Sequence, residues 1–132
     1  MQASDLRSGN IVKNDSLDVF KKGFIQIHAR HIAEIAVYNS AQTGDSWVKH
    51  FNPVLISKQW FYELGFKPDN DESSELVKNG FHIIELPDGS FEFFNHDYAI
   101  KIYYVHQLQN LYYSLMNEEL ISDDEIQPYS LH

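Results

Sequence analysis

One amphipathic helix near the C-terminal end of the sequence constrains the fold more than any other feature. Residues 102–120, IYYVHQLQNLYYSLMNEEL, form the longest stretch with a single consistent periodicity. Apolar side chains recur there at the three- and four-residue spacing of one helix face. They are Val105, Leu108, Leu111, Tyr112, Leu115 and Met116. We therefore expect a helix of about three to four turns that covers a sheet with its apolar face.

The residues before this helix have the pattern of an antiparallel meander. Residues 76–102 contain short β-favouring runs separated by turn residues. The turn Pro87-Asp88-Gly89 predicts a type I turn closed by a G1 bulge, which places Glu85 opposite Phe91. A two-residue turn would instead set Glu85 against Glu92, two like charges across the ladder. The bulged register is therefore preferred.

A short helix is predicted ahead of the meander, at residues 57–65. Ser57 is a good N-cap for it, and Gly65 stands where a left-handed residue ends a helix. Phe66 would then pack back against the helix. Residues 67–74, KPDNDESS, are the most polar stretch and are predicted to be a linker or mobile loop.

The N-terminal part of the chain has several short strand-like runs separated by polar turns. Residues 11–12, 24–28 and 53–56 favour strands. Residues 29–38 fit either a helix or a strand, and a strand is preferred because β-branched and aromatic residues precede the turn formers. Closely spaced short strands of this kind indicate a small barrel, for which an SH3-like form is one option.

Together these patterns predict an α+β protein. Residues 1–56 would form the small β-barrel-like unit, and residues 57–120 the connecting helix, the meander and the closing helix. Residues 121–132 would be an acidic flexible tail. Whether the first two parts are two domains or one continuous fold is left open.

Composition excludes several classes of function. The chain has no cysteine, so disulfides, thiolate metal sites and cysteine nucleophiles are ruled out. A net charge of −9 and scattered basic residues argue against nucleic-acid binding. The start lacks the basic and apolar regions of a signal peptide, and no apolar run approaches the roughly eighteen residues of a membrane span. We therefore expect a soluble cytoplasmic protein without membrane contact.

Three phrases of the sequence resemble those of a known family. Residues 6–12, LRSGNIV, resemble an "LRIGN-x-V" opening, and residues 53–66 resemble "PIPLTEEWL…FGF". Residues 104–112, YVHQLQNLY, resemble "YVHQLQNLYF", which that family follows with "ALTGEEL". The chain differs at Ser8, where the family tends to have Ile, and at Asn117, where it tends to have Gly.

This pattern is similar to that of an uncharacterised family found in Bacteroidetes genomes and in their phages and integrated elements. The resemblance implies a bacterial or phage cytosolic protein. It implies no activity, and no catalytic residue can be transferred from it.

The seven histidines are the first candidates for metal or acid–base chemistry. His28 and His31 are three residues apart, which would suit a metal only on a helix. His82, His96 and Asp97, together with Glu92, could converge as a minimal metal-dependent hydrolase site. A solvated hairpin edge is the preferred reading of those residues, so no catalytic residue, metal site or cofactor is predicted.

The closing helix carries the candidate recognition site. Its polar strip of His106, Gln109, Asn110 and Tyr113 could recognise a ligand or partner. The preferred alternative is that the strip is scaffold, with His106 and Asn110 bonding to each other or to loop backbone. His106 is expected to be neutral at pH 7, because a helix N-terminus disfavours a positive charge.

Paired aromatic residues at 93–94, 103–104 and 112–113 should each place one ring in the core and one outside. The outward rings would favour self-association or a protein partner. Three functions follow in order of preference. The first is a non-enzymatic interaction or accessory protein, the second a nucleic-acid-binding module that uses the small barrel, and the third a metal-dependent hydrolase.

Overall fold

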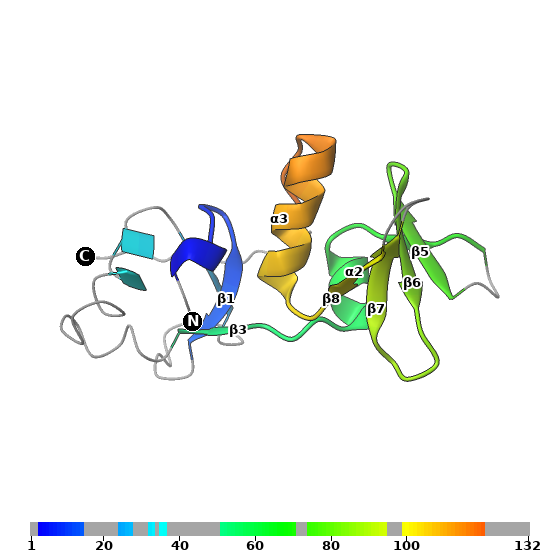
Figure 1. Ribbon diagram of the computed structural model, residues 1–132, viewed down its shortest axis with the longest axis horizontal. Helices are drawn as coiled ribbons and strands as arrows, with labels where there is room; N and C mark the ends of the chain where they lie inside the picture. The colour runs from blue at the N-terminus through cyan, green and yellow to red at the C-terminus, as the bar shows by residue number, and fades with distance from the viewer. Residues whose placement is uncertain are drawn as a thin grey trace. The chain divides into compact units, whose positions relative to one another are not determined.

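The computed structural model describes residues 3–14, 24–27, 32–33, 35–36, 51–70, 74–94 and 99–120 (Figure 1). These residues fall into two compact units, one of which ends at Val54 while the other begins at Leu55. The described part is of mixed α+β type, as predicted. None of its helices is long and apolar enough to cross a membrane.

The N-terminal unit contains a three-stranded antiparallel sheet with the order β2-β1-β3. A short 3-10 helix, η1 (Ala3–Asp5), precedes it. The strands are β1 (Ile11–Asn14), β2 (Phe24–Gln26) and β3 (Phe51–Pro53). Val12, on the central strand, lies opposite Ile25 on one side and Pro53 on the other, and it is fully buried. The described residues form an open sheet, and no closed barrel is found among them.

A tight turn leads into β1 and accounts for the first of the three phrases. Gly9 has a φ of 97°, a conformation that glycine adopts without strain. The Asn10 side chain accepts a hydrogen bond from the Arg7 amide at 2.6 Å. Asn10 is fully buried, and its carbonyl oxygen accepts a hydrogen bond from the Ile27 amide at 3.0 Å. The LRSGN phrase therefore forms a hydrogen-bonded turn that fixes the start of β1 against β2.

The preferred strand at residues 29–38 is wrong where the structure describes it. Residues 32–33 and 35–36 are helical, and Ile35 is buried. Ile32, Ile35 and Ala36 have the i, i+3, i+4 spacing of a helix face. This periodicity outweighs the strand propensity of the β-branched residues Ile35 and Val37. The helical alternative is therefore correct at these residues.

The C-terminal unit is built on a five-stranded antiparallel sheet in which every strand pairs with the next one in the chain. Its strands are β4 (Lys67–Pro68), β5 (Glu75–Lys78), β6 (Phe81–Glu85), β7 (Phe91–Phe94) and β8 (Ala99–Ile102). Helix α2 (Lys58–Glu63) precedes the sheet, and helix α3 (Val105–Met116) follows it. The predicted meander and closing helix are confirmed.

The β6–β7 hairpin has the predicted bulged register. Glu85 lies opposite Phe91, and Ile83 lies opposite Phe93. Gly89 has a φ of 86°, and its amide donates to the Leu86 carbonyl at 2.9 Å. Hydrogen bonds from the Ser90 hydroxyl and amide hold the pKa of the exposed Asp88 carboxyl below its ordinary value. The turn residues therefore predict this register correctly.

Helix α2 begins and ends as predicted. The Trp60 amide donates to the Ser57 hydroxyl at 3.3 Å, so Ser57 is the N-cap. At the other end the Phe66 amide donates to the Phe61 carbonyl at 2.9 Å, and the Gly65 amide donates to the Tyr62 carbonyl at 3.0 Å. These two bonds form a Schellman motif, and the Phe61 and Phe66 rings meet edge to face.

The polar stretch at residues 67–74 is not entirely a linker. Lys67 and Pro68 form β4 and pair with Val77 and Leu76 of β5. Residues 71–73 lie outside the described residues. The two-residue strand is too short to be seen in the pattern of a polar sequence, so the prediction was wrong at its start.

An aromatic cluster on one face of the sheet holds the C-terminal unit together. Its six rings come from α2, the loop after it, strands β6 and β7, and α3: Phe61, Phe66, Phe81, Phe91, Phe93 and Tyr112. The centroid of the Phe81 ring lies 4.5 Å from the centroid of the Phe93 ring and 5.2 Å from that of the Tyr112 ring. Because both helices contribute rings to this cluster, both cover the same face of the sheet.

Candidate interaction surface

Of the four predicted recognition residues of α3, two are buried and two are not. His106, with 7% of its surface exposed, and Gln109, with none exposed, are buried. Asn110 is half-buried, while Tyr113 is exposed. The buried face of the helix runs through Val105, Leu108, Gln109 and Tyr112. The strip therefore does not face solvent as one surface.

Gln107, a residue of the third phrase, links the start of α3 to the end of β8 through two hydrogen bonds. Its side-chain oxygen accepts a hydrogen bond from the Tyr103 amide at 2.8 Å. Its amide nitrogen donates to the Lys101 carbonyl at 3.0 Å. A side chain in the first turn that reaches back to backbone before the helix works as in a capping box. Tyr104, the N-cap residue, has no side-chain capping bond of its own.

Gln109 has a corresponding role at the other end of the helix. Its amide nitrogen donates to the carbonyl of Leu120 at 3.3 Å, in a fully buried position. Asn117 has a left-handed conformation, with φ 55° and ψ 32°, and reverses the chain after the helix. Gly and Asn are the residues that end helices in this conformation, so the departure from Gly at this position has a plain physical reason.

One histidine of the C-terminal sheet contacts a carboxylate. The His82 ring nitrogen Nδ1 is hydrogen-bonded to Glu75 Oε1 on the neighbouring strand. His28, His31, His96 and Asp97 lie outside the described residues. In the part of the chain that the structure describes, no three His, Asp or Glu side chains gather as metal ligands.

A shallow depression of about 570 Å³ lies at the turn of the β6–β7 hairpin. Its lining is Ser74, Ile84, Glu85, Leu86, Pro87 and Gly89. Glu85 is the one acidic side chain in that lining, and it lies 3.8 Å from Lys58 of α2. Glu85 is therefore the only titratable side chain among the residues that line this depression.

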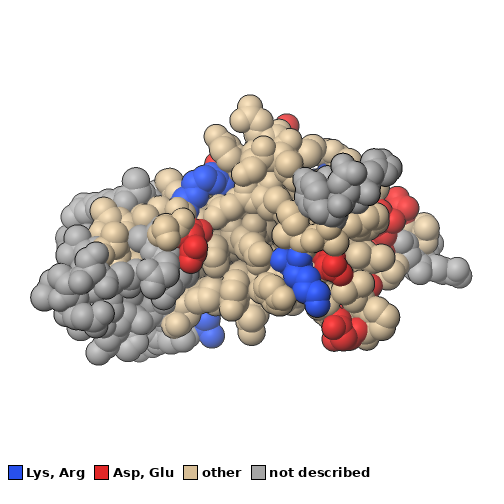
Figure 2. Space-filling model, viewed as in Figure 1, with Lys and Arg blue, Asp and Glu red and all other residues tan. Residues whose placement is uncertain are grey.

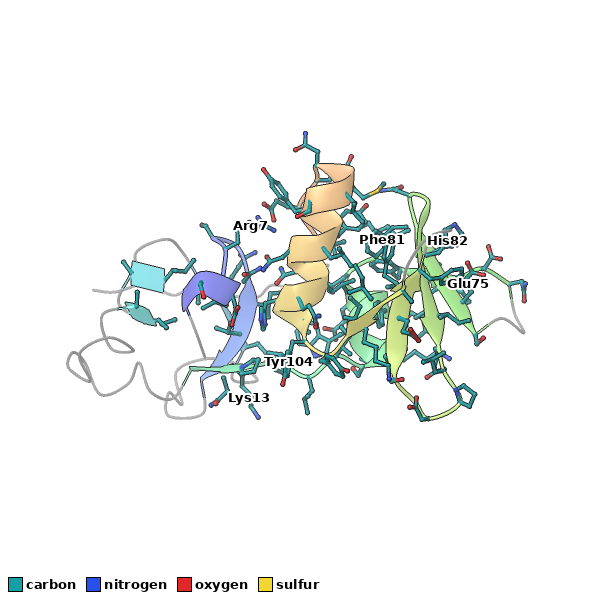
Figure 3. All side chains as sticks on the ribbon, viewed as in Figure 1. Arg7, Lys13, Glu75, Phe81, His82 and Tyr104 are labelled. Atoms are coloured by element: carbon teal, nitrogen blue, oxygen red, sulfur yellow. The ribbon has the colours of Figure 1, made fainter. Side chains whose placement is uncertain are left out.

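The strongest candidate surface is the face of the five-stranded sheet opposite the helices. Alternation along the strands directs Phe81 toward α3, while Glu75 and His82 lie on the other side (Figure 3). We call this other side the open face. It consists of Glu75, Val77, His82, Ile84, Glu92, Phe94, Ala99 and Lys101. We add Tyr103, which directly follows β8 and continues its alternation. None of these residues is buried.

The open face carries two of the predicted outward rings. Phe94 is 41% exposed and Tyr103 is 53% exposed, while Phe93 beside Phe94 is buried. In the third pair Tyr112 is buried and Tyr113 is exposed. The prediction that each aromatic pair splits between core and surface is therefore confirmed for residues 93–94 and 112–113. Tyr104, the inner residue of the remaining pair, is half-buried.

The open face carries charges of both signs. Glu92 lies directly opposite Lys101 in the β7–β8 ladder. Lys67 of β4 lies opposite Val77 and so extends the same face. In Figure 2 the described Lys and Arg side chains of the visible surface are scattered and form no continuous basic patch.

The alternation in the strands of this surface is visible in the sequence, but it does not show which face of the sheet the helices cover. Residues in β5 to β8 alternate between buried and solvent-facing positions, and several of the solvent-facing ones are apolar: Val77, Ile84, Phe94 and Tyr103.

Comparison of the chain with protein-family models, curated proteins and solved structures found no match.

Proposed function

We propose that this protein is a non-enzymatic interaction protein, a cytoplasmic accessory factor of bacterial or mobile-element origin, that binds a protein partner through the open face. One observation carries the proposal. Both helices of the C-terminal unit, α2 and α3, pack on the same side of the sheet, so neither of them covers the other side.

The composition of the open face supports a binding role. The exposed face of an antiparallel sheet is ordinarily polar. Here Val77, Ile84 and Phe94 stand among the charged residues, and Tyr103 adds a fourth large side chain directly after β8. Aromatic rings surrounded by polar groups are typical of protein interfaces. This mixture favours a protein partner over a small cofactor, which needs a concave site.

The phrases of the sequence that are most distinctive support the same proposal indirectly. Contacts with backbone groups account for Asn10, Gln107 and Gln109. These side chains are engaged in holding turns and helix ends together. Binding is therefore assigned to the sheet face and not to the α3 strip.

For the N-terminal unit, the β2-β1-β3 sheet supports our proposal that this unit forms a small SH3-like barrel.

The test is affinity purification of the tagged full-length chain from the cells in which it occurs. We expect the wild-type chain to retain a specific protein, either another protein or further copies of itself. The double variant Phe94→Ser/Tyr103→Ser should lose it. Tyr62→Ser is the matched control, because Tyr62 is an exposed ring on α2, on the helix side of the sheet.

Circular dichroism of each variant establishes that the fold is kept. Loss of the retained protein in the double variant alone would support the open face as the binding surface. Equal retention by all three chains would place binding elsewhere. A wild-type chain that retains nothing and is monomeric would overturn the proposed function.

A further inference from the structure

The open face has a charge balance unlike that of the whole protein. The chain as a whole has a formal charge of −9. The open face with its β4 extension carries two lysines, Lys67 and Lys101, and two glutamates, Glu75 and Glu92, which cancel. Two copies that approach through other acidic surfaces repel each other. Two copies that approach through this face bring a locally neutral surface together and repel each other less.

The order of charges across the face is also self-complementary. One row of directly opposed residues runs Glu75, Ile84, Glu92, Lys101 from β5 to β8. It begins with an acid and ends with a base. Since neighbouring strands lie about 4.8 Å apart, Glu75 and Lys101 are roughly 14 Å from each other in one chain and do not pair within it.

A two-fold axis parallel to the strands, between β6 and β7, would bring the two ends of this row together. Such an axis reverses the strand order, so that β8 of one copy faces β5 of the other. Lys101 then faces Glu75 of the second copy, and this contact occurs twice. In the next row, Val77 faces Ala99 and Phe94 faces His82. The middle strands therefore bring Phe94, His82 and Ile84 into the contact together with Glu92, which faces Ile84 of the other copy.

We propose that the occupant of the open face is a second copy of this chain, packed sheet against sheet in a symmetric dimer. The inference rests on the proposed function, because it names the partner of the same surface. Face-to-face packing of two antiparallel sheets is an ordinary arrangement in proteins. Here it would bury Phe94 and pair Glu75 and Lys101 between copies.

Charge exchange tests this arrangement by sedimentation velocity on the full-length chain at low ionic strength. We expect the wild-type chain to change with concentration from its 15.4 kDa monomer to a dimer. Lys101→Glu and Glu75→Lys should each weaken dimerisation at least about tenfold, because each variant creates two like-charge contacts across the axis. Lys58→Glu, on α2, is the matched charge control and should leave dimerisation unchanged.

An equimolar mixture of the two single variants is the decisive measurement. In the mixed dimer, the carboxylate introduced by Lys101→Glu would face the ammonium group introduced by Glu75→Lys, and the second contact would be the original one. We therefore expect the mixture to dimerise although neither variant does so alone. Recovery cannot arise from chains that failed to fold, so it reports the contact itself.

Three outcomes separate this inference from the proposed function. A mixture that stays monomeric, or single variants that dimerise like the wild-type chain, would overturn the sheet-to-sheet dimer. A monomeric wild-type chain that still retains a different protein through Phe94 and Tyr103 would overturn the dimer and leave the proposed function standing. A monomeric chain that retains nothing would overturn both.

Discussion

The C-terminal end of α2 depends on the absence of a side chain at one residue. Gly65 has a φ of 92°, which L side chains rarely adopt. A Cβ atom there would also lie 2.8 Å from Lys78 Nζ. That ammonium group donates to the Leu64 carbonyl at 2.9 Å and lies 5.8 Å from the centre of the Tyr112 ring. The backbone conformation therefore favours glycine, and any larger residue would also force Lys78 Nζ to shift.

We expect Gly65→Ala to lower the free energy of unfolding by about 1–2 kcal/mol through backbone strain, and further through displacement of Lys78. Gly80→Ala is the matched control. Gly80 has a similar φ of 82°, but no atom lies within 4 Å of an added Cβ. Urea denaturation of both variants measures the difference. Equal losses would show that Lys78 moves aside without cost.

At the scale of single residues, the sequence was informative where the partner is local. Ser57, Gly65 and Gly89 occupy positions set by rules that span a few neighbouring residues. Gln107 and Gln109 bond to the backbone of Lys101, Tyr103 and Leu120, which only the folded chain brings close. Their polar character could be seen in the sequence, but their partners could not.

At the scale of elements, the β8–α3 junction shows how a sheet edge is protected. The Gln107 side chain bonds both the Lys101 carbonyl and the Tyr103 amide, as a neighbouring strand would. The Ile56 amide donates to the Tyr103 carbonyl at 2.8 Å and continues the same edge. Exposed strand edges invite pairing with other chains. Closing this edge leaves the open face, and not the β8 edge, for association.

We expect Gln107→Ala to lower the free energy of unfolding by roughly 1–3 kcal/mol, since it removes two hydrogen bonds at once. Amide hydrogen exchange at Tyr103 should become faster than in the wild-type chain. Gln59→Ala is the matched control, because Gln59 is an exposed glutamine of α2. Its effect should stay within about 0.5 kcal/mol. Unchanged exchange at Tyr103 in Gln107→Ala would contradict the capping role.

The bounds of α3 were predictable, but its rotation was not. The predicted apolar face included Leu111 and Leu115, yet Leu111 is half-buried and Leu115 is 48% exposed. Two overlapping apolar stripes exist on this helix, and periodicity does not choose between them. The helix buries the stripe that contains Gln109, and there the Leu120 carbonyl accepts a hydrogen bond from the Gln109 side-chain amide. A polar residue at that position had concealed the correct face.

At the scale of the whole molecule, the aromatic cluster identifies a self-contained core. All six of its rings lie between Phe61 and Tyr112, in the unit that begins at Leu55. The α+β type, the meander and both of its helices followed from local patterns. The open face did not, because it depends on both helices choosing the same side of the sheet. Tertiary packing determines which side each helix covers, and the sequence of either helix alone does not show it.

We expect residues 55–124, produced alone, to fold cooperatively, because every ring of the cluster among the described residues lies within this range. Phe81→Ala should lower the free energy of unfolding by about 3–5 kcal/mol, the usual cost of removing a buried phenylalanine ring. Its cost should be the same in the fragment and in the full-length chain, since its ring neighbours Phe66, Phe93 and Tyr112 are present in both. Chemical denaturation followed by aromatic fluorescence measures each value. A markedly smaller cost in the fragment would mean that the core requires the N-terminal unit to form.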